Sequence, residues 1–131
     1  MKQLFFLPLL LLIILSSCKK ETAQAEKLTQ EQERELLEKR HEEIIKISES
    51  VSCVNSNGWL YTAIGSKACG GPTGYIAYSK HIDTIAFLHK VEAFTTAQNN
   101  YNIKWEMISD CSLPPNPKGV NCKNGVAVLV Y

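Results

Sequence analysis

The sequence lacks a marked excess of charge of either sign. Its 131 residues contain 14 Lys and Arg against 13 Asp and Glu, so the formal net charge at pH 7 is +1. Proteins that bind nucleic acids through electrostatics usually carry a clear positive excess, often gathered in one run. Neither such an excess nor an internal repeat is visible in this chain. We therefore expect a single domain and no nucleic-acid partner.

The common catalytic and metal-binding patterns are absent as well. A serine hydrolase would carry Gly-x-Ser-x-Gly, which does not occur here. Two metal-ligating histidines on one helix face would stand four residues apart, but the three histidines are His41, His81 and His89. The acidic residues of the second half are too scattered to form a predicted carboxylate pair: Asp83, Glu92, Glu106 and Asp110. The sequence therefore predicts no metal site and no cofactor.

The sequence also lacks a hydrophobic run long enough to cross a bilayer as a helix. The longest run, residues 4–15, has twelve uncharged residues. As a helix it would rise only about 18 Å, whereas a hydrocarbon core is roughly 30 Å thick. Lys2 precedes this run, and the small residues Ser16 and Ser17 follow it. A basic start, a short apolar stretch and a small-residue end are typical of a secretory signal peptide.

The end of this segment, Leu15-Ser16-Ser17-Cys18, resembles the lipobox of bacterial lipoproteins. The resemblance covers residues 1–18 and implies cleavage after residue 17, with diacylglycerol and a further acyl chain such as palmitate on Cys18. Several acyl chains on one residue exceed the two signals that stable membrane anchoring needs. Lys19, rather than Asp, at the second mature position implies the outer membrane, on its periplasmic or surface face. The alternative is an ordinary signal peptide with an incidental cysteine.

Four further cysteines indicate a disulfide framework. They are Cys53, Cys69, Cys111 and Cys122. An even number of cysteines in a small exported protein is typical of paired thiols. Four cysteines allow three connectivities, between which sequence alone does not decide. We expect the two pairs that are local in sequence, Cys53 with Cys69 and Cys111 with Cys122.

The first helix is predicted over residues 29–51, after a polar tether at residues 18–28. Thr29 and Gln32 have the spacing of a capping box, in which each side chain accepts a hydrogen bond from the other's backbone N–H. The first two turns carry almost no apolar residues, so we expect a stalk that projects before the helix packs. A coiled coil is the alternative, but two heptads are fewer than that assignment needs.

The second helix is predicted to begin after Asp83, a good N-cap, and to end at Asn102. Its apolar residues recur at helical spacing: Phe87, Leu88, Val91, Phe94 and Tyr101. The following residues 103–108 fit either a short strand or a last helical turn. Residues 113–119 contain three prolines and are expected to be irregular.

Two strand regions are expected. Residues 59–64 are rich in aromatic and branched side chains and predict a strand. The glycine- and proline-rich residues 66–74 predict a turn that admits a disulfide, and residues 75–79 predict a helical turn. Residues 120–131 predict a β-hairpin around Asn124-Gly125. Because both faces of residues 126–131 are apolar, we expect this last strand to be central and to lie beside residues 59–64.

Together these elements predict an α+β domain over residues 29–131, with a small, mostly antiparallel sheet, packed helices and disulfides that join its loops. Parts of residues 53–131 resemble a group of small uncharacterised exported bacterial proteins. The segments concerned are residues 65–72, Ser109-Asp110-Cys111 and Cys122-Lys123-Asn124-Gly125. No activity is implied by this resemblance.

Two classes of function remain open. The first is a non-enzymatic, lipid-anchored module of the cell envelope that binds a protein or small molecule, including a protease. Its candidate binding loop is stiffened by Pro114, Pro115 and Pro117 and presents Lys118 to a trypsin-like pocket. The second is a small hydrolase or redox protein that uses Cys69 as its thiol, beside His81 or His89. Counting free thiols would separate the two classes.

Overall fold

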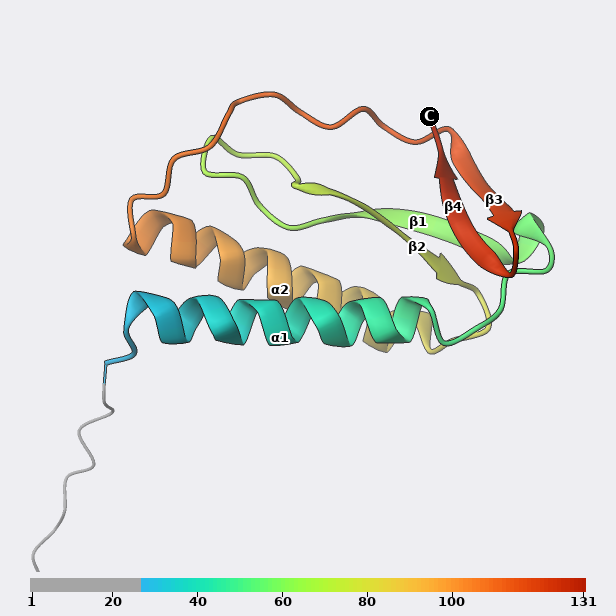
Figure 1. The fold of residues 1–131 in the computed structure, drawn as a ribbon, viewed down its shortest axis with the longest axis horizontal. Coiled ribbons are helices and arrows are strands. Elements are labelled where there is room, and N and C mark those ends of the chain that lie inside the picture. The colour runs from blue at the N-terminus through green and yellow to red at the C-terminus, as the bar shows by residue number, and fades with distance from the viewer. Residues whose placement is uncertain (1–26) are drawn as a thin grey trace, which may run out of the picture.

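The computed structural model describes residues 27–131, and it is an α+β fold as predicted (Figure 1). The expected signal peptide, residues 1–17, and Cys18 lie outside the described residues. The elements, in order, are α1 (Gln30–Ser48), η1 (Ser56–Gly58), β1 (Trp59–Ile64), β2 (Gly74–Ser79), α2 (Thr84–Lys104), β3 (Gly119–Lys123) and β4 (Val126–Val130). Within residues 27–131, no helix has both the length and the apolar character to cross a membrane.

Helix α1 begins with the predicted capping box. The Gln32 backbone N–H donates to Thr29 Oγ1 at 3.3 Å, and the Thr29 N–H donates to Gln32 Oε1 at 2.9 Å. The predicted stalk is wrong, because the first turn of α1 already contacts the end of α2. Glu33 accepts hydrogen bonds from Lys104 Nζ and, at 2.8 Å, from Trp105 Nε1. The docking contact is polar, so hydrophobic spacing gave no sign of it.

Helix α2 runs antiparallel to α1 beneath the sheet (Figure 1). Asp83 caps it as predicted, with its carboxylate accepting from the Ala86 N–H at 3.0 Å. The helix continues past the predicted end at Asn102 and includes residues 103–104, so this segment is a last helical turn rather than a strand. Glu106 then takes a left-handed backbone conformation, with φ of 48°, which ends the helix.

Strands β1 and β2 form an antiparallel hairpin whose register pairs Trp59 with Ser79 and Ile64 with Gly74. The predicted helical turn at residues 75–79 is wrong, because these residues are strand β2. Side chains alternate between the two faces of a sheet. The face toward the helices carries the main core cluster: Ile64, Ile76 and Tyr78 of the hairpin with Ile44, Phe87, Val91 and Phe94 of the helices.

The opposite face of β1 and β2 is covered by the second hairpin and by the chain that leads into it (Figure 1). Strands β3 and β4 pair around Asn124 and Gly125, whose φ angles of 53° and 81° fit the predicted type I′ turn. The inner side of this hairpin packs on Trp59 and Ala77 in a second, smaller cluster. The fold thus has three layers, with β1 and β2 in the middle.

The predicted central position of the last strand is wrong. Within residues 27–131, β4 pairs with β3 alone, in a sheet separate from β1 and β2. Ala127 and Leu129 pack inward, whereas Val126, Val128 and Val130 are 56%, 41% and 40% exposed. The inner face of this apolar strand is therefore buried and its outer face is exposed, so the strand is not buried on both sides.

Candidate functional site

The four described cysteines form two disulfides, but not the expected pairs. Cys53 bonds to Cys122, with Cα atoms 5.3 Å apart, and Cys69 bonds to Cys111, with Cα atoms 5.5 Å apart. The preference for sequence-local pairs is therefore wrong. The second hairpin folds back over Trp59 and carries Cys122 to the chain before β1, while the turn after β1 meets the chain that leaves α2. Tertiary packing decides the pairing, and sequence distance does not.

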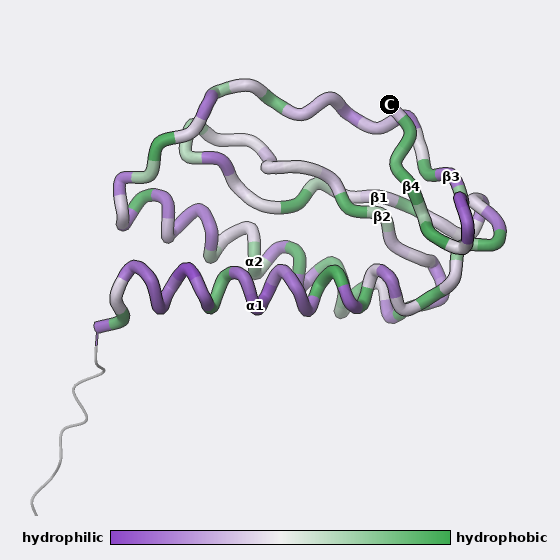
Figure 2. The backbone as a smooth tube through the Cα atoms, in the orientation of Figure 1, coloured by the Kyte–Doolittle hydropathy of each residue, from purple (hydrophilic) through white to green (hydrophobic). Residues whose placement is uncertain are grey.

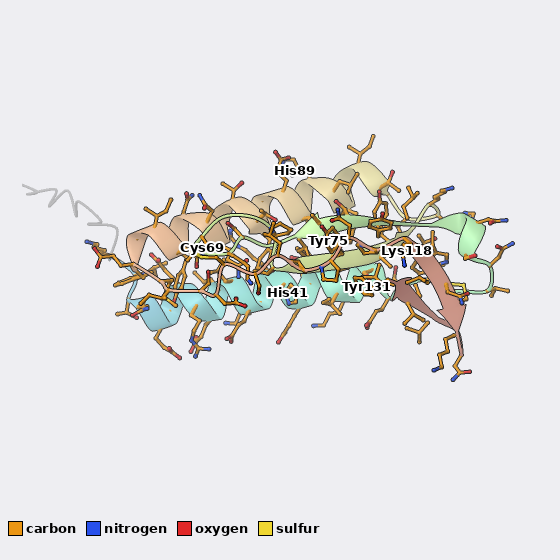
Figure 3. All side chains as sticks on the ribbon, turned by 90° about the horizontal axis from the view of Figure 1, so that it is seen from above. His41, Cys69, Tyr75, His89, Lys118 and Tyr131 are labelled. Atoms are coloured by element: carbon orange, nitrogen blue, oxygen red, sulfur yellow. A yellow bond between two sulfur atoms is a disulfide. The ribbon has the colours of Figure 1, made fainter. Side chains whose placement is uncertain are left out.

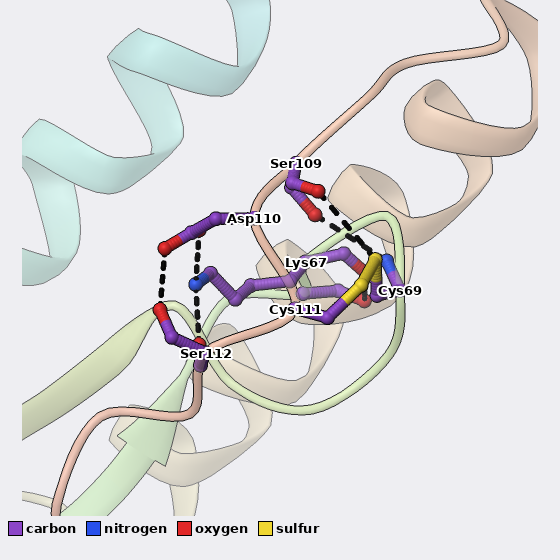
Figure 4. The surroundings of a disulfide bond; sticks show 7 residues. Lys67, Cys69, Ser109, Asp110, Cys111 and Ser112 are labelled. Atoms are coloured by element: carbon purple, nitrogen blue, oxygen red, sulfur yellow. Dashed lines mark hydrogen bonds and ion pairs between the residues drawn. A yellow bond between two sulfur atoms is a disulfide. The ribbon is translucent and has the colours of Figure 1, made fainter.

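The Cys69–Cys111 disulfide lies at the surface within a small polar cluster (Figure 4). Lys67 Nζ donates to Asp110 Oδ1 at 2.6 Å and to the Ser112 carbonyl oxygen at 2.5 Å. The Ser112 hydroxyl donates to the other oxygen of the Asp110 carboxylate. The hydrogen bond from Lys67, together with that from Ser112, lowers the pKa of Asp110 below its usual value. These contacts fasten the chain after α2 to the turn after β1.

A thiol site at Cys69 would require this disulfide to be reduced first. The candidate histidine partners also lie elsewhere. His89 is on the outer side of α2, well away from Cys69 (Figure 3). His81 lies against Gly58, beside the start of β1. His41 contacts Phe94, with ring centroids 5.2 Å apart. Among residues 27–131, no three His, Cys, Asp or Glu side chains gather where they could hold a metal ion.

The proline-rich segment is held against the sheet as a strap, which we define as residues 110–118. Tyr61 donates its hydroxyl to the Pro117 carbonyl oxygen at 2.7 Å, and Tyr75 donates to Asn116 Oδ1. Pro117 is buried, Pro114 is half-buried, and Pro115 is exposed. The strap is not closed by a Cys111–Cys122 disulfide as expected, because Cys111 is bonded to Cys69.

Lys118 projects its side chain into solvent at the end of the strap (Figure 3). Its backbone is not free, because the Lys118 N–H donates to the Val130 carbonyl oxygen at 2.6 Å. The preceding carbonyl, that of Pro117, accepts from Tyr61. A substrate-like inhibitor loop offers its main chain to the protease as an extended segment. Here the main chain on either side of the Pro117–Lys118 bond is already engaged within the molecule.

An apolar groove with a volume of about 680 Å³ lies beside β4. Its floor is the outer side of β2, including Tyr75 and Ala77, and Trp59 of β1. One wall is the end of α1 with Val51, and the other wall is β4 with Tyr131. Glu49 is the one charged residue among those that line it. The groove therefore suits an apolar occupant.

The free edge of β4 faces this groove. The Cys53 N–H donates to the Gly125 carbonyl oxygen at 2.8 Å, which shows that Gly125 points its backbone away from β3. Backbone groups alternate in direction along an antiparallel strand, so Ala127 and Leu129 point the same way. Cys53 and Gly125 form an isolated bridge, and the ladder does not continue. Among the described residues, no strand pairs with this edge of β4 beyond Gly125.

The outer edge of β2, by contrast, is partly closed. Ser48, which is nearly inaccessible at the end of α1, donates its hydroxyl to the Ala77 carbonyl oxygen at 2.9 Å. An unpaired strand edge is a template for pairing with another chain. The groove therefore combines an apolar floor, one capped edge and one open edge. That combination is suited to receiving an extended polypeptide.

Sequence reasoning singled out the strap and missed the groove. Its one signal was the uncharged run Val126–Tyr131, which was assigned to the interior instead. No protein-family model matches this chain, and neither the curated proteins nor the solved structures searched contain a significant match.

Proposed function

We propose that this protein is a non-enzymatic, lipid-anchored binding module of the cell envelope, and that the groove beside β4 takes an extended apolar segment of a protein partner as an added strand. The observation that carries the proposal is the open β4 edge above an apolar floor. In strand addition, main-chain hydrogen bonds supply affinity and side-chain pockets supply specificity. The single charge in the lining, Glu49, favours a partner strand with a basic residue at that end.

The anchor rests on the lipobox at residues 15–18. Cys18→Ser would remove the sulfur that carries the diacylglycerol. We expect wild-type protein to partition into the detergent phase of a phase-separating extract, and the variant to be soluble or unprocessed. Wild-type protein found in the aqueous phase, with no acyl groups on its N-terminal peptide, would contradict the lipoprotein assignment.

The groove is tested by placing a photo-crosslinking amino acid at Val128 in the lipid-anchored protein in cells. We expect adducts that map to an extended, largely uncharged segment of a partner protein. Ala127→Pro removes an N–H that faces the groove and leaves the ladder to β3 intact, since proline is tolerated at a strand edge. It should abolish the adduct without changing the circular dichroism melt.

Val54 provides the matched control position, because it is 88% exposed and does not line the groove. A crosslinker there should give no adduct with the same partner segment. Adducts at Val128 that survive Ala127→Pro would contradict strand addition. Adducts only with a second copy of this chain would replace the proposed partner by a dimer.

Protease inhibition through Lys118 would also be a non-enzymatic binding function. It is less supported than strand addition, because the main chain around Lys118 is hydrogen-bonded within the molecule. The thiol alternative at Cys69 is also less supported, since the sulfur is paired with Cys111. Titration under denaturing, non-reducing conditions should find no free thiol in the acylated protein. One free thiol per chain would revive the enzyme alternative.

A further inference from the structure

The end of the molecule at which the described chain begins carries a group of exposed apolar side chains. We call this group the apolar tip and define it as Leu28, Ile103, Met107 and Ile108. Ile108 is 94% exposed and Ile103 is 70% exposed, while Leu28 and Met107 are each about two-fifths exposed. Figure 2 shows hydrophobic residues where the chain leaves α2, next to the start of α1. Strongly exposed isoleucines in one small region indicate a surface that meets another apolar phase.

Contacts place these residues at one end. Gln30 Nε2 donates to Met107 Sδ at 3.5 Å, which sets the chain after α2 against the first turn of α1. Leu28 and Lys104 line one shared hollow between the two helices. Lys104 is paired with Glu33 in that same region. The apolar tip is therefore built from the entry of α1 and the exit of α2.

The short chain segment between Cys18 and the tip supports the bilayer as the surface that the tip meets. Eight residues, 19–26, separate Cys18 from the described chain, and the nine residue-to-residue steps from Cys18 to Lys27 span at most about 30–32 Å at full extension. Helix α1 has 19 residues, about 28 Å of length, and it leads away from that end. If Cys18 is acylated, the tip is the part of the domain that the tether holds nearest to the lipid.

The charged side chains around the tip are compatible with contact to a bilayer that contains no anionic lipid. Two lysines of this end are already neutralised, Lys104 by Glu33 and Lys67 by Asp110. Two exposed side chains of opposite charge, Glu106 beside Met107 and Lys27 beside Leu28, form no salt bridge with any residue in the described range. Anionic headgroups would repel the Glu106 carboxylate and attract the Lys27 ammonium group, so these two charges offset each other. Contact would therefore depend on apolar insertion and not on charge attraction.

We propose that the apolar tip inserts its exposed side chains into the interfacial region of the bilayer and so stands the domain end-on, with the groove beside β4 turned away from the membrane. This inference rests on the proposed lipid anchor. It adds a second, protein-borne membrane contact to the acyl chains. The orientation would leave the open strand edge accessible to partners that do not lie in the same leaflet.

The test uses the mature, acylated protein in phosphatidylcholine vesicles whose acyl chains carry bromine, a short-range quencher of tryptophan fluorescence. Ile108→Trp places a reporter in the tip. Ile85→Trp is the matched control, because Ile85 is also an isoleucine, is 83% exposed, and occupies the first turn of α2, at the opposite end of that helix. Unmodified protein supplies the background emission of Trp59 and Trp105. Both variants change exposed side chains, and their melts should match that of the unmodified protein.

We expect the added emission of Ile108→Trp to shift to the blue and to lose most of its intensity, and that of Ile85→Trp to stay unchanged. Replacing part of the phosphatidylcholine by phosphatidylglycerol should not strengthen the effect. Equal quenching at both positions would mean that the domain lies flat, and quenching only with phosphatidylglycerol would mean charge attraction. Each of these results would overturn the inference.

Failure of the anchor itself is distinguishable from failure of the tip. Protein that floats with the vesicles, yet shows no quenching of Ile108→Trp, would overturn the tip contact and leave the anchor standing. Protein that carries no acyl group on Cys18 and does not float would overturn the proposed anchor and the inference together.

Discussion

The two ends of the molecule are each stabilised by a different kind of interaction. We call them the hairpin end, where β3 and β4 lie, and the tether end, where α1 begins and α2 ends. At the hairpin end, the Cys53–Cys122 disulfide is covered, with Cys53 only 3% exposed, and it sits among Trp59, Ala77 and Leu129. At the tether end, the Cys69–Cys111 disulfide is exposed, and its neighbours are Lys67, Asp110 and Ser112. The first end is joined by apolar packing, and the second by hydrogen bonds and ion pairs. The difference predicts that the two ends respond differently to mutation and to pH.

The largest effect should come from removing each disulfide in turn. The loops have sequence separations of 69 and 42 residues. Chain entropy alone then predicts losses of about 4 kcal/mol for either pair, with the longer loop ahead by less than ~0.5 kcal/mol. Replacing both Cys53 and Cys122 by Ala also opens space in a packed cluster, which adds about 1 kcal/mol or more. Urea unfolding of the two double variants measures the difference.

If the variant lacking Cys69 and Cys111 proves the less stable of the two, the contrast between a packed and a polar end is wrong. A loss for the Cys53–Cys122 pair that is larger by less than ~0.5 kcal/mol would mean that loop entropy alone decides, with no contribution from packing around Cys53. A single Cys→Ala change is not informative here, because it leaves a free thiol that can exchange with the other disulfide.

A smaller effect is expected where the strap crosses the sheet between the two ends. Tyr61→Phe removes the hydroxyl that donates to the Pro117 carbonyl oxygen and keeps the ring. The loss should be about 0.5–1.5 kcal/mol, the usual net contribution of one hydrogen bond. Tyr61 and Tyr75 contact each other edge to face, with ring centroids 6.1 Å apart. Because the two residues are neighbours, the loss of stability in the double variant Tyr61→Phe with Tyr75→Phe should differ from the sum of the two single losses. Additive losses would show that each tyrosine holds the strap independently.

The smallest effect is expected from acid, and it should be strongest at the tether end. Hydrogen bonds from Lys104 and then Trp105 lower the pKa of Glu33, and those from Lys67 and then Ser112 lower the pKa of Asp110. A carboxyl whose pKa is lower in the folded state contributes stability above its unfolded pKa of about 4 and loses that contribution as the pH falls further. Hydrogen exchange should therefore rise first near residues 30–36 and 105–112 below about pH 4.

Glu33→Gln provides the control for this pH dependence. It keeps an acceptor for the Trp105 N–H and cannot titrate, so the acid-induced rise near residues 30–36 should be reduced to the part that Glu31, paired with Arg34, contributes. Exchange that rises first in β3 and β4 would contradict the assignment of the acid-sensitive contacts to the tether end.

Local signals allowed much of the fold to be predicted. The capping box at Thr29, the Asp83 cap and the Asn124-Gly125 turn depend on neighbouring residues, and all three are confirmed. The α+β class followed from the same signals. Contacts between distant segments could not be predicted in this way. The disulfide pairing, the polar docking of α1 and the edge position of β4 are set by packing in three dimensions, and each expectation about them was wrong.

The groove could not have been predicted for a related reason. An apolar strand reads the same in sequence whether it is buried on both faces or presents one face and one edge to solvent. In the sequence, Val126, Val128 and Val130 are consistent with a strand that is buried on both faces. In the structure they lie on an exposed face of β4. Cysteine count, by contrast, does not depend on arrangement, and the prediction that all four pair in disulfides is confirmed.

The central claim is that the molecule has one end for lipid and another for protein. It is tested most directly by a photo-crosslinking amino acid placed at Ile108 or at Val128 of the same acylated protein in cells, with the adducts analysed by mass spectrometry. The account predicts lipid adducts from Ile108 and polypeptide adducts from Val128. Lipid adducts from Val128, or polypeptide adducts in place of lipid from Ile108, would contradict it.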